Sequence, residues 1–141
     1  MFKKIFKKQK KESPDNKRVL VAALLINAAK IDENYTDIEK KIIKIALENI
    51  YNISSDQVEE LMIHAEKKEE EQNQIIEFTK EIKKHSMESR LKIIEIIWKI
   101  VYSDGVSDSY ESNLIRRICG LLYISDKDSG IIKTKVRNLL K

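Results

Sequence analysis

The scarcity of turn-forming residues constrains the fold of this chain more than any other feature. Its 141 residues include three glycines and one proline, the two residue types that most strongly interrupt helices and make tight turns. Leu, Glu and Lys, which favour helices, are abundant. A β-sheet requires more turn chemistry than this chain offers, so the sequence predicts long helices joined by few turns.

The spacing of apolar residues predicts an all-α, single-domain bundle of about seven helices. One core at this length can bury about two thirds of the surface of the unfolded chain, and apolar residues recur every three or four positions. The charged run at residues 66–72 interrupts the pattern, and we expect a solvated helix end or a turn there. The expected helices begin near Lys17, Ile38, Ser55, Gln74, Met87, Tyr110 and Asp126.

Positive charge is concentrated in an N-terminal tail. Residues 1–18 contain eight Lys or Arg and two Asp or Glu, a net charge of +6, and because the whole chain carries +4 the remainder carries −2. Basicity confined to a tail gives little support to a nucleic-acid partner, which a folded basic surface would bind. We therefore divide the chain into a basic tail and linker, residues 1–16, and a helical domain, residues 17–141.

The start of the tail has the pattern of a basic amphipathic helix. Phe2, Ile5 and Phe6 fall on one helical face, and lysines occupy the rest. Such a segment can lie on an anionic membrane surface, so residues 1–12 would bring the protein to the inner membrane surface. A solvated tail, or a helix packed on the domain, explains the same pattern, and these readings stay open.

Cysteine usage and hydropathy indicate a cytoplasmic protein. Cys119 is the only cysteine, which rules out an intrachain disulfide and fits a reducing compartment. No early apolar run resembles a signal peptide or reaches the length of a membrane span.

Two acidic corners between expected helices repeat each other. A shift of 72 positions aligns them and continues into the flanking apolar residues, which predicts an internal duplication and hence a two-fold pseudo-repeat in the bundle. The aligned pairs are Asp32 with Asp104, Thr36 with Asp108, and Glu39 with Glu111.

The corners have a structural and a functional interpretation. Thr36-x-x-Glu39 and Asp108-x-x-Glu111 both match the capping box, in which the two side chains satisfy free amides of the first helical turn. Carboxylates at this density also repel unless they share a cation, and oxygen ligands favour Ca²⁺ or Mg²⁺. The spacing excludes an EF-hand, whose ligands span twelve positions with glycine at the sixth.

The phrase at residues 102–115, Tyr-Ser-Asp-Gly-Val-Ser-Asp-Ser-Tyr-Glu-Ser-Asn-Leu-Ile, resembles the Asp-Gly corner of the tellurite-resistance TerB-like family. This helical domain also occurs in some membrane-anchored J-domain co-chaperones. The resemblance covers roughly residues 18–141. The first corner departs from the pattern, because Lys30-Ile31-Asp32-Glu33 stands where Ala-Asp-Gly is expected.

The resemblance implies a non-enzymatic, all-helical domain associated with metal or stress responses. It also implies a divalent-cation site at Asp104 and Glu111, and at Asp32 and Glu39 in the divergent corner. A protein partner would respond to the bound cation, and neither a small-molecule substrate nor another cofactor is expected.

The alternative functions assign a different role to the two acidic corners, or none. In a metal-independent adaptor or co-chaperone-like module the corners are helix caps, and the tail recruits the domain to the membrane. Binding to nucleic acid would rest on the lysines of the tail alone, without a platform for base stacking. An enzyme is disfavoured, because no nucleophile–base pair, phosphate loop or cofactor motif is present, and we place His64 and His85 at helix surfaces or ends.

Overall fold

The computed structural model describes residues 15–30, 35–72, 74–104 and 109–139. These residues form seven α-helices and one short 3₁₀ helix, without a β-strand among them, which confirms the expected all-α class. The elements are α2 (Asn16–Ala29), α3 (Asp37–Tyr51), α4 (Ser55–Gln72), α5 (Ile75–Ile82), α6 (Met87–Val101), η2 (Tyr102–Asp104), α7 (Ser109–Leu121) and α8 (Asp126–Leu139).

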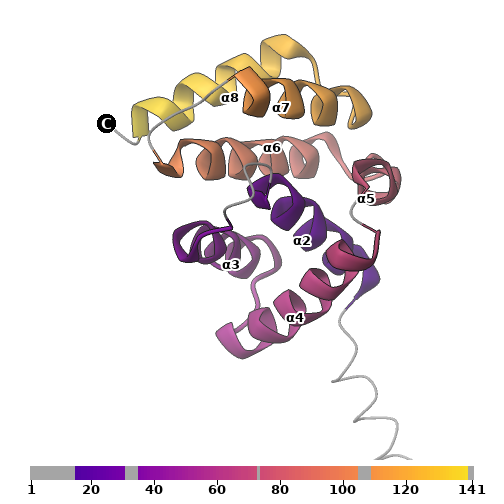
Figure 1. The fold of residues 1–141 in the computed structure, drawn as a ribbon. Coiled ribbons are helices and arrows are strands. Elements are labelled where there is room, and N and C mark those ends of the chain that lie inside the picture. The colour runs from indigo at the N-terminus through magenta and orange to yellow at the C-terminus, as the bar shows by residue number, and fades with distance from the viewer. Residues whose placement is uncertain (1–14, 31–34, 73, 105–108, 140–141) are drawn as a thin grey trace, which may run out of the picture.

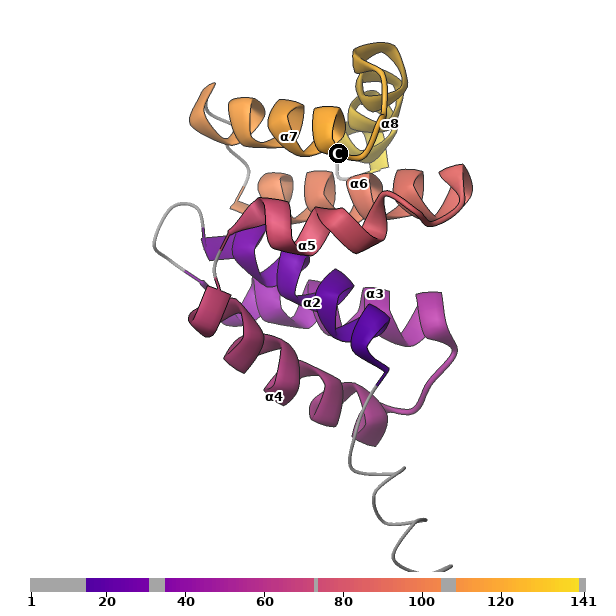
Figure 2. The same cartoon turned by 90° about the vertical axis from the view of Figure 1, so that its right-hand side faces the viewer.

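Helix α2 is the centre of the bundle. Ten of its 14 residues are buried, and they lie on every side of the helix, as expected for a helix that is apolar all round. Helices α3, α4, α5 and α6 all pack against it, and Figures 1 and 2 show them arranged around it. The positions of these four helices are therefore set by contact with α2.

Helix α6 joins this group to a second layer. It packs against α2 and α3 on one side and against α7 and α8 on the other (Figure 1). Its buried residues include Trp98, whose Nε1 donates a hydrogen bond to Ser129 Oγ of α8 at 3.2 Å. Because both faces of α6 are covered, it carries Ile93, Ile94, Ile96 and Ile97 as a nearly continuous apolar run.

Side-chain caps explain why the helices begin where the sequence predicts. Ser54 and Gln57 form a reciprocal pair at the start of α4, with Gln57 N to Ser54 Oγ at 3.2 Å and Ser54 N to Gln57 Oε1 at 2.9 Å. Ser86 Oγ accepts from the amide of Ser89 at the start of α6. Each such cap satisfies an amide that has no partner inside the helix.

The charged run at residues 66–72 differs in part from expectation. It is a helix end, because α4 continues through it to Gln72, but it is not wholly solvated. Glu69 is only 4% exposed, because α4 packs along α2 and this residue faces the end of that helix. Lys30 and Asn27 contact its carboxylate, and these polar contacts make the burial tolerable.

Helices α3 and α7 end in the same way. Asn52 and Tyr123, which follow them, have positive φ angles of 51° and 59°. In each case the next amide bonds back five residues, from Ile53 to Glu48 O at 3.3 Å and from Ile124 to Cys119 O at 2.8 Å. This is the Schellman arrangement. This similarity is limited to the two helix ends, and the duplication that would relate the two halves of the bundle remains a prediction.

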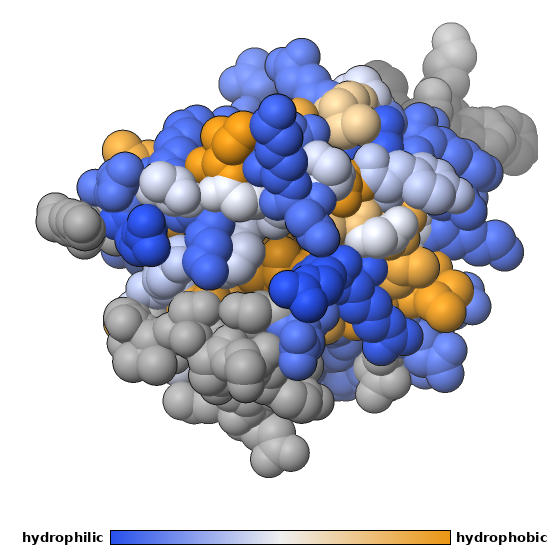
Figure 3. Space-filling model, turned by 90° about the horizontal axis from the view of Figure 1, so that it is seen from above, coloured by the Kyte–Doolittle hydropathy of each residue, from blue (hydrophilic) through white to orange (hydrophobic). Residues whose placement is uncertain are grey.

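The face formed mainly by α7 and α8 is hydrophilic with separate hydrophobic side chains, as the view from above shows (Figure 3). Exposed apolar residues of α8 include Ile131 and Leu139. Single exposed residues of this kind are normal on protein surfaces and do not by themselves indicate a docking site. No helix in the described ranges combines the length and apolarity that a membrane crossing requires.

The left-handed conformation of Tyr123 predicts a stability gain on substitution. This conformation costs a residue with a Cβ roughly 1 kcal/mol, whereas glycine adopts it freely. The Tyr123 side chain is 66% exposed, so its removal loses little beyond a contact of Lys83 with the ring. Tyr123→Gly should therefore raise the free energy of unfolding by roughly 0.5 kcal/mol in urea denaturation.

The matched control is Asn52→Tyr, which places the disfavoured residue at the corresponding end of α3. It should lower the stability, because asparagine tolerates the left-handed region better than tyrosine. A loss of stability in Tyr123→Gly would mean that the tyrosine side chain contributes more than its backbone conformation costs.

Candidate functional site

The two acidic corners lie at the same end of the molecule. In Figure 2, α2 and α6 both end towards the left-hand side, and α3 and α7 both begin there. Asp32 falls outside the described residues. Asp104 ends η2 and Glu111 lies in the first turns of α7, but their side chains are also outside the described part. Of the four predicted site residues, Glu39 is therefore the one whose side chain can be placed.

Glu39 belongs to a complete capping box at the start of α3. The amide of Thr36 donates to Glu39 Oε1 at 2.9 Å, and the amide of Glu39 donates to Thr36 Oγ1 at 3.1 Å. The hydroxyl of Thr36 donates to the same carboxylate oxygen at 3.1 Å. The predicted cap of the first corner is thus confirmed, and it holds a carboxylate that is 8% exposed in one orientation.

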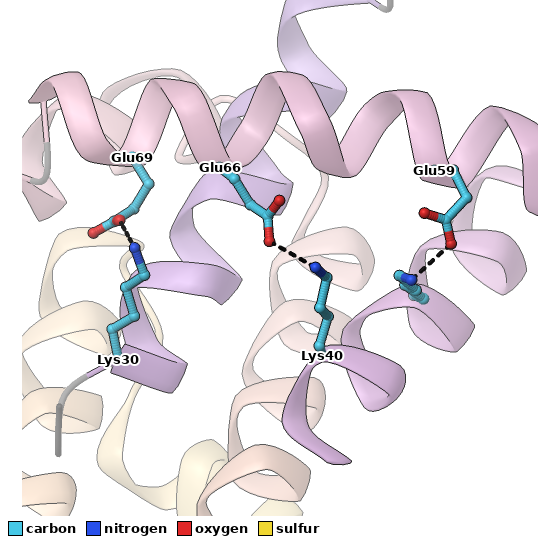
Figure 4. A network of polar contacts seen from close by, with 6 residues as sticks. Lys30, Lys40, Glu59, Glu66 and Glu69 are labelled. Carbon is cyan, nitrogen blue, oxygen red and sulfur yellow. Dashed lines mark hydrogen bonds and ion pairs between the residues drawn. The ribbon is translucent and has the colours of Figure 1, made fainter. Parts of the chain in front are cut away.

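Two glutamates of α4 reach the same region (Figure 4). Glu69 Oε1 lies 2.8 Å from Lys30 Nζ at the end of α2, and its Oε2 accepts from Asn27 Nδ2 at 3.0 Å. Glu66 Oε2 lies 3.2 Å from Lys40 Nζ of α3. Helix α4 therefore bridges the end of α2 and the beginning of α3, which are the two sides of the first corner.

Tyr35 precedes the cap of α3 in this corner. Its hydroxyl oxygen is buried and has no hydrogen-bond partner of ordinary distance and angle among the described residues. Burial raises the pKa of Tyr35, and the negative charges of Glu66, Glu39 and Glu69 raise it further. The Tyr35 hydroxyl therefore remains protonated at neutral pH.

The corner cluster is defined as Glu39, Glu66 and Glu69 with Lys30 and Lys40. Glu69 and Glu66 each pair with one of the two lysines, and residues 31–34, which join the two sides of the corner, include Asp32 and Glu33. Within the described residues, no three Asp, Glu, His or Cys side chains are grouped so that they could hold a metal ion. A cation here would need an oxygen ligand from residues 31–34 as well.

Sequence reasoning missed Glu66 and Glu69, although one signal for Glu69 exists. The buried residues of α4 include Val58, Met62 and Ala65, and Glu69 continues this stripe at the helical spacing of four. A glutamate in register with an apolar stripe indicates a buried carboxylate, which needs partners. No local sequence pattern marks Glu66, because its contact with Lys40 depends on how α4 packs against α3.

The other chemically active side chains lie apart from the corner cluster. Cys119 is buried as expected, and this burial raises the pKa of its thiol, which keeps it unreactive. His64 lies on α4, where its Nδ1 is 2.9 Å from the carbonyl oxygen of Glu60, and His85 follows the end of α5. Both histidines thus occupy the helix-surface or helix-end positions that the sequence predicts.

The burial of Glu69 predicts unequal effects of the same substitution at two lysines. Lys30→Met leaves the Glu69 carboxylate, whose side chain is 6% exposed, with Asn27 as its remaining partner, and should cost about 2 to 3 kcal/mol. Lys44→Met breaks the pair with Glu59, whose side chain is 57% exposed, and should cost less than about 1 kcal/mol. Urea denaturation of the two variants measures the difference. Equal losses would show that the Lys30–Glu69 pair behaves as a surface ion pair.

The bundle and its corners agree with a match to a known family. The family model described as tellurite resistance protein TerB matches residues 18–134, a range that begins within α2 and ends within α8. No curated protein and no solved structure matches the chain. Because the family model covers most of the sequence and the fold is an all-helical bundle, the chain belongs to the TerB family of tellurite-resistance proteins.

Proposed function

We propose that this protein is a non-enzymatic interaction module that binds a divalent cation at its acidic corners and transmits the bound state to a protein partner. The observation that supports it is that α4 bridges the two sides of the first corner, through the pairs Lys30–Glu69 and Lys40–Glu66. The capping glutamate Glu39 starts α3 there, and the connecting residues 31–34 include Asp32 and Glu33.

The first corner supplies hard oxygen ligands, which suit Ca²⁺ or Mg²⁺. Glu39 is held rigidly by its cap, and Asp32 would approach from the connecting segment. In the second corner Asp104 and Glu111 would play the corresponding parts.

Asp32 and Glu33 make the first corner a candidate for the Ca²⁺ ion in particular. Ca²⁺ accepts six to eight oxygen ligands in flexible geometry, whereas Mg²⁺ requires a nearly ideal octahedron and keeps several waters. A site shared between a rigid helix start and a connecting segment fits the more tolerant ion.

The partner-binding part of the proposal rests on α3, which begins at the corner. Ile38 is the neighbour of the capping glutamate and is 63% exposed, and Ile45 is 49% exposed. A partner with an apolar surface would cover these side chains. Ile38 and Glu39 are adjacent in the first turn of α3. A cation that holds Glu39 in place would therefore also hold Ile38 in place.

The capping box allows the charge of Glu39 to be removed without removing the cap, since glutamine serves equally at this position. With a dissociation constant of about 1 mM, about 10 mM Ca²⁺ should stabilise the native protein by about 1.4 kcal/mol. The melting temperature should then rise by about 4 to 6 °C at constant ionic strength. Glu39→Gln should lose most of this rise and keep its stability in EDTA.

Gln57→Glu is the matched control. It creates a second glutamate-based capping box at the start of α4, where Ser54 and Gln57 already form a reciprocal pair, and its melting temperature should respond to Ca²⁺ like that of the unaltered protein. If neither Ca²⁺ nor Mg²⁺ raises the melting temperature, or if Glu39→Gln responds fully, the corner is a helix cap. The metal-independent adaptor, recruited to membranes by residues 1–12, would then be the better account.

A further inference from the structure

A cavity of about 320 Å³ lies at the other end of α3 from the acidic corner. Its walls come from α2, from the last turn of α3, and from the segment that leads from His85 into α6. The first corner adjoins Asp37 and the cavity adjoins Tyr51, so about 20 Å of helix separates them. The cavity is therefore a separate feature, and its volume is at the lower end of the range for small-ligand sites.

The floor of the cavity is apolar and its rim is polar. Val21 and Ile93 are buried at the floor, with half-buried Ile50 beside them. The rim carries Asn49, His85, Glu88, Ser89 and Lys92. An apolar floor with a few polar groups at the mouth is the usual composition of a small-ligand site.

The opposite charges at the rim do not neutralise each other. Glu88 and Lys92 are spaced i and i+4 on α6, the arrangement that favours an ion pair. Both side chains line the cavity, and neither belongs to the ion pairs formed among the described residues, although Lys92 also acts electrostatically on Glu95. Further along the same helix, Glu95 and Lys99 have the same spacing and do pair, at 3.5 Å. One acidic and one basic group thus remain available at the mouth.

Tyr51 forms a firm wall between the floor and the rim. The guanidinium of Arg18 lies over its ring, 4.8 Å from the ring centre, and this contact restrains the ring. Burial raises the pKa of Tyr51 to about 12, so its hydroxyl is a neutral donor at physiological pH. An aromatic wall of this kind suits an apolar side chain on the ligand.

From this arrangement we propose that the cavity binds a small zwitterion with an apolar side chain, which is the chemistry of a free apolar α-amino acid. The carboxylate would face Lys92, the ammonium group would face Glu88, and the side chain would enter between Tyr51, Val21 and Ile93. Recognition of both charges distinguishes such a ligand from the end of a peptide chain, where the ammonium and carboxylate groups belong to different residues.

The experiment is an amide NMR titration of the full chain with L-leucine and L-phenylalanine at millimolar concentrations. Saturable shifts should appear at Tyr51, His85 and Ile93. N-acetyl-leucine lacks the ammonium group and leucinamide lacks the carboxylate, so each should bind about tenfold more weakly or worse, as expected for the loss of a charged contact. Equal binding of N-acetyl-leucine would instead assign the cavity to the carboxyl end of a peptide and overturn the proposal.

Variants of α6 that remove one charge each provide a second test of the proposal. Glu88→Gln and Lys92→Met are exposed substitutions and should leave the fold intact by circular dichroism, while each weakens leucine binding by about tenfold. Glu59→Gln and Lys44→Met remove the charges of an ion pair that does not line the cavity and should leave binding unchanged. The proposal fails if no shift saturates, or if the two sets of variants have the same effect.

Discussion

The burial of α2 on every side is the constraint on which the rest of the structure depends. A helix with ten buried residues out of 14 requires neighbours all round, since about 25 cal/mol is lost for each Å² of apolar surface left in water. Helices α3, α4, α5 and α6 supply this cover. Lys30, at the end of α2, is consequently brought to Glu69, so the polar corner is a product of the apolar core.

The bundle could be predicted from the sequence because its signals are local. Ser54, Ser86 and Ser125 mark helix starts by a hydrogen bond within three residues, and such bonds need no knowledge of the tertiary fold. Glu66 and Glu69 could not be placed in this way. A run of charged residues usually indicates a solvated surface, and the burial of Glu69 depends on residues 39 and 42 positions away in the chain.

Glu39 shows why the candidate site was only partly predictable. Its cap follows from the spacing Thr36-x-x-Glu39, and the structure confirms it. A second role depends on which other carboxylates reach this corner, and Glu66 and Glu69 are brought there by the packing of α4 against α3 and α2. Asp32, Asp104 and Glu111 remain predictions, since their side chains lie outside the described residues.

The most direct test of the cation site is to locate the ion on the folded protein by an amide NMR titration with Ca²⁺. The account predicts saturable shift changes that are concentrated from Ile31 to Glu39 and around Glu66 and Glu69, with a second group near residues 103–111. Shift changes that do not saturate, or that spread evenly over the exposed acidic residues of α4, would contradict it. They would show that the corners stabilise helix ends and bind no specific cation.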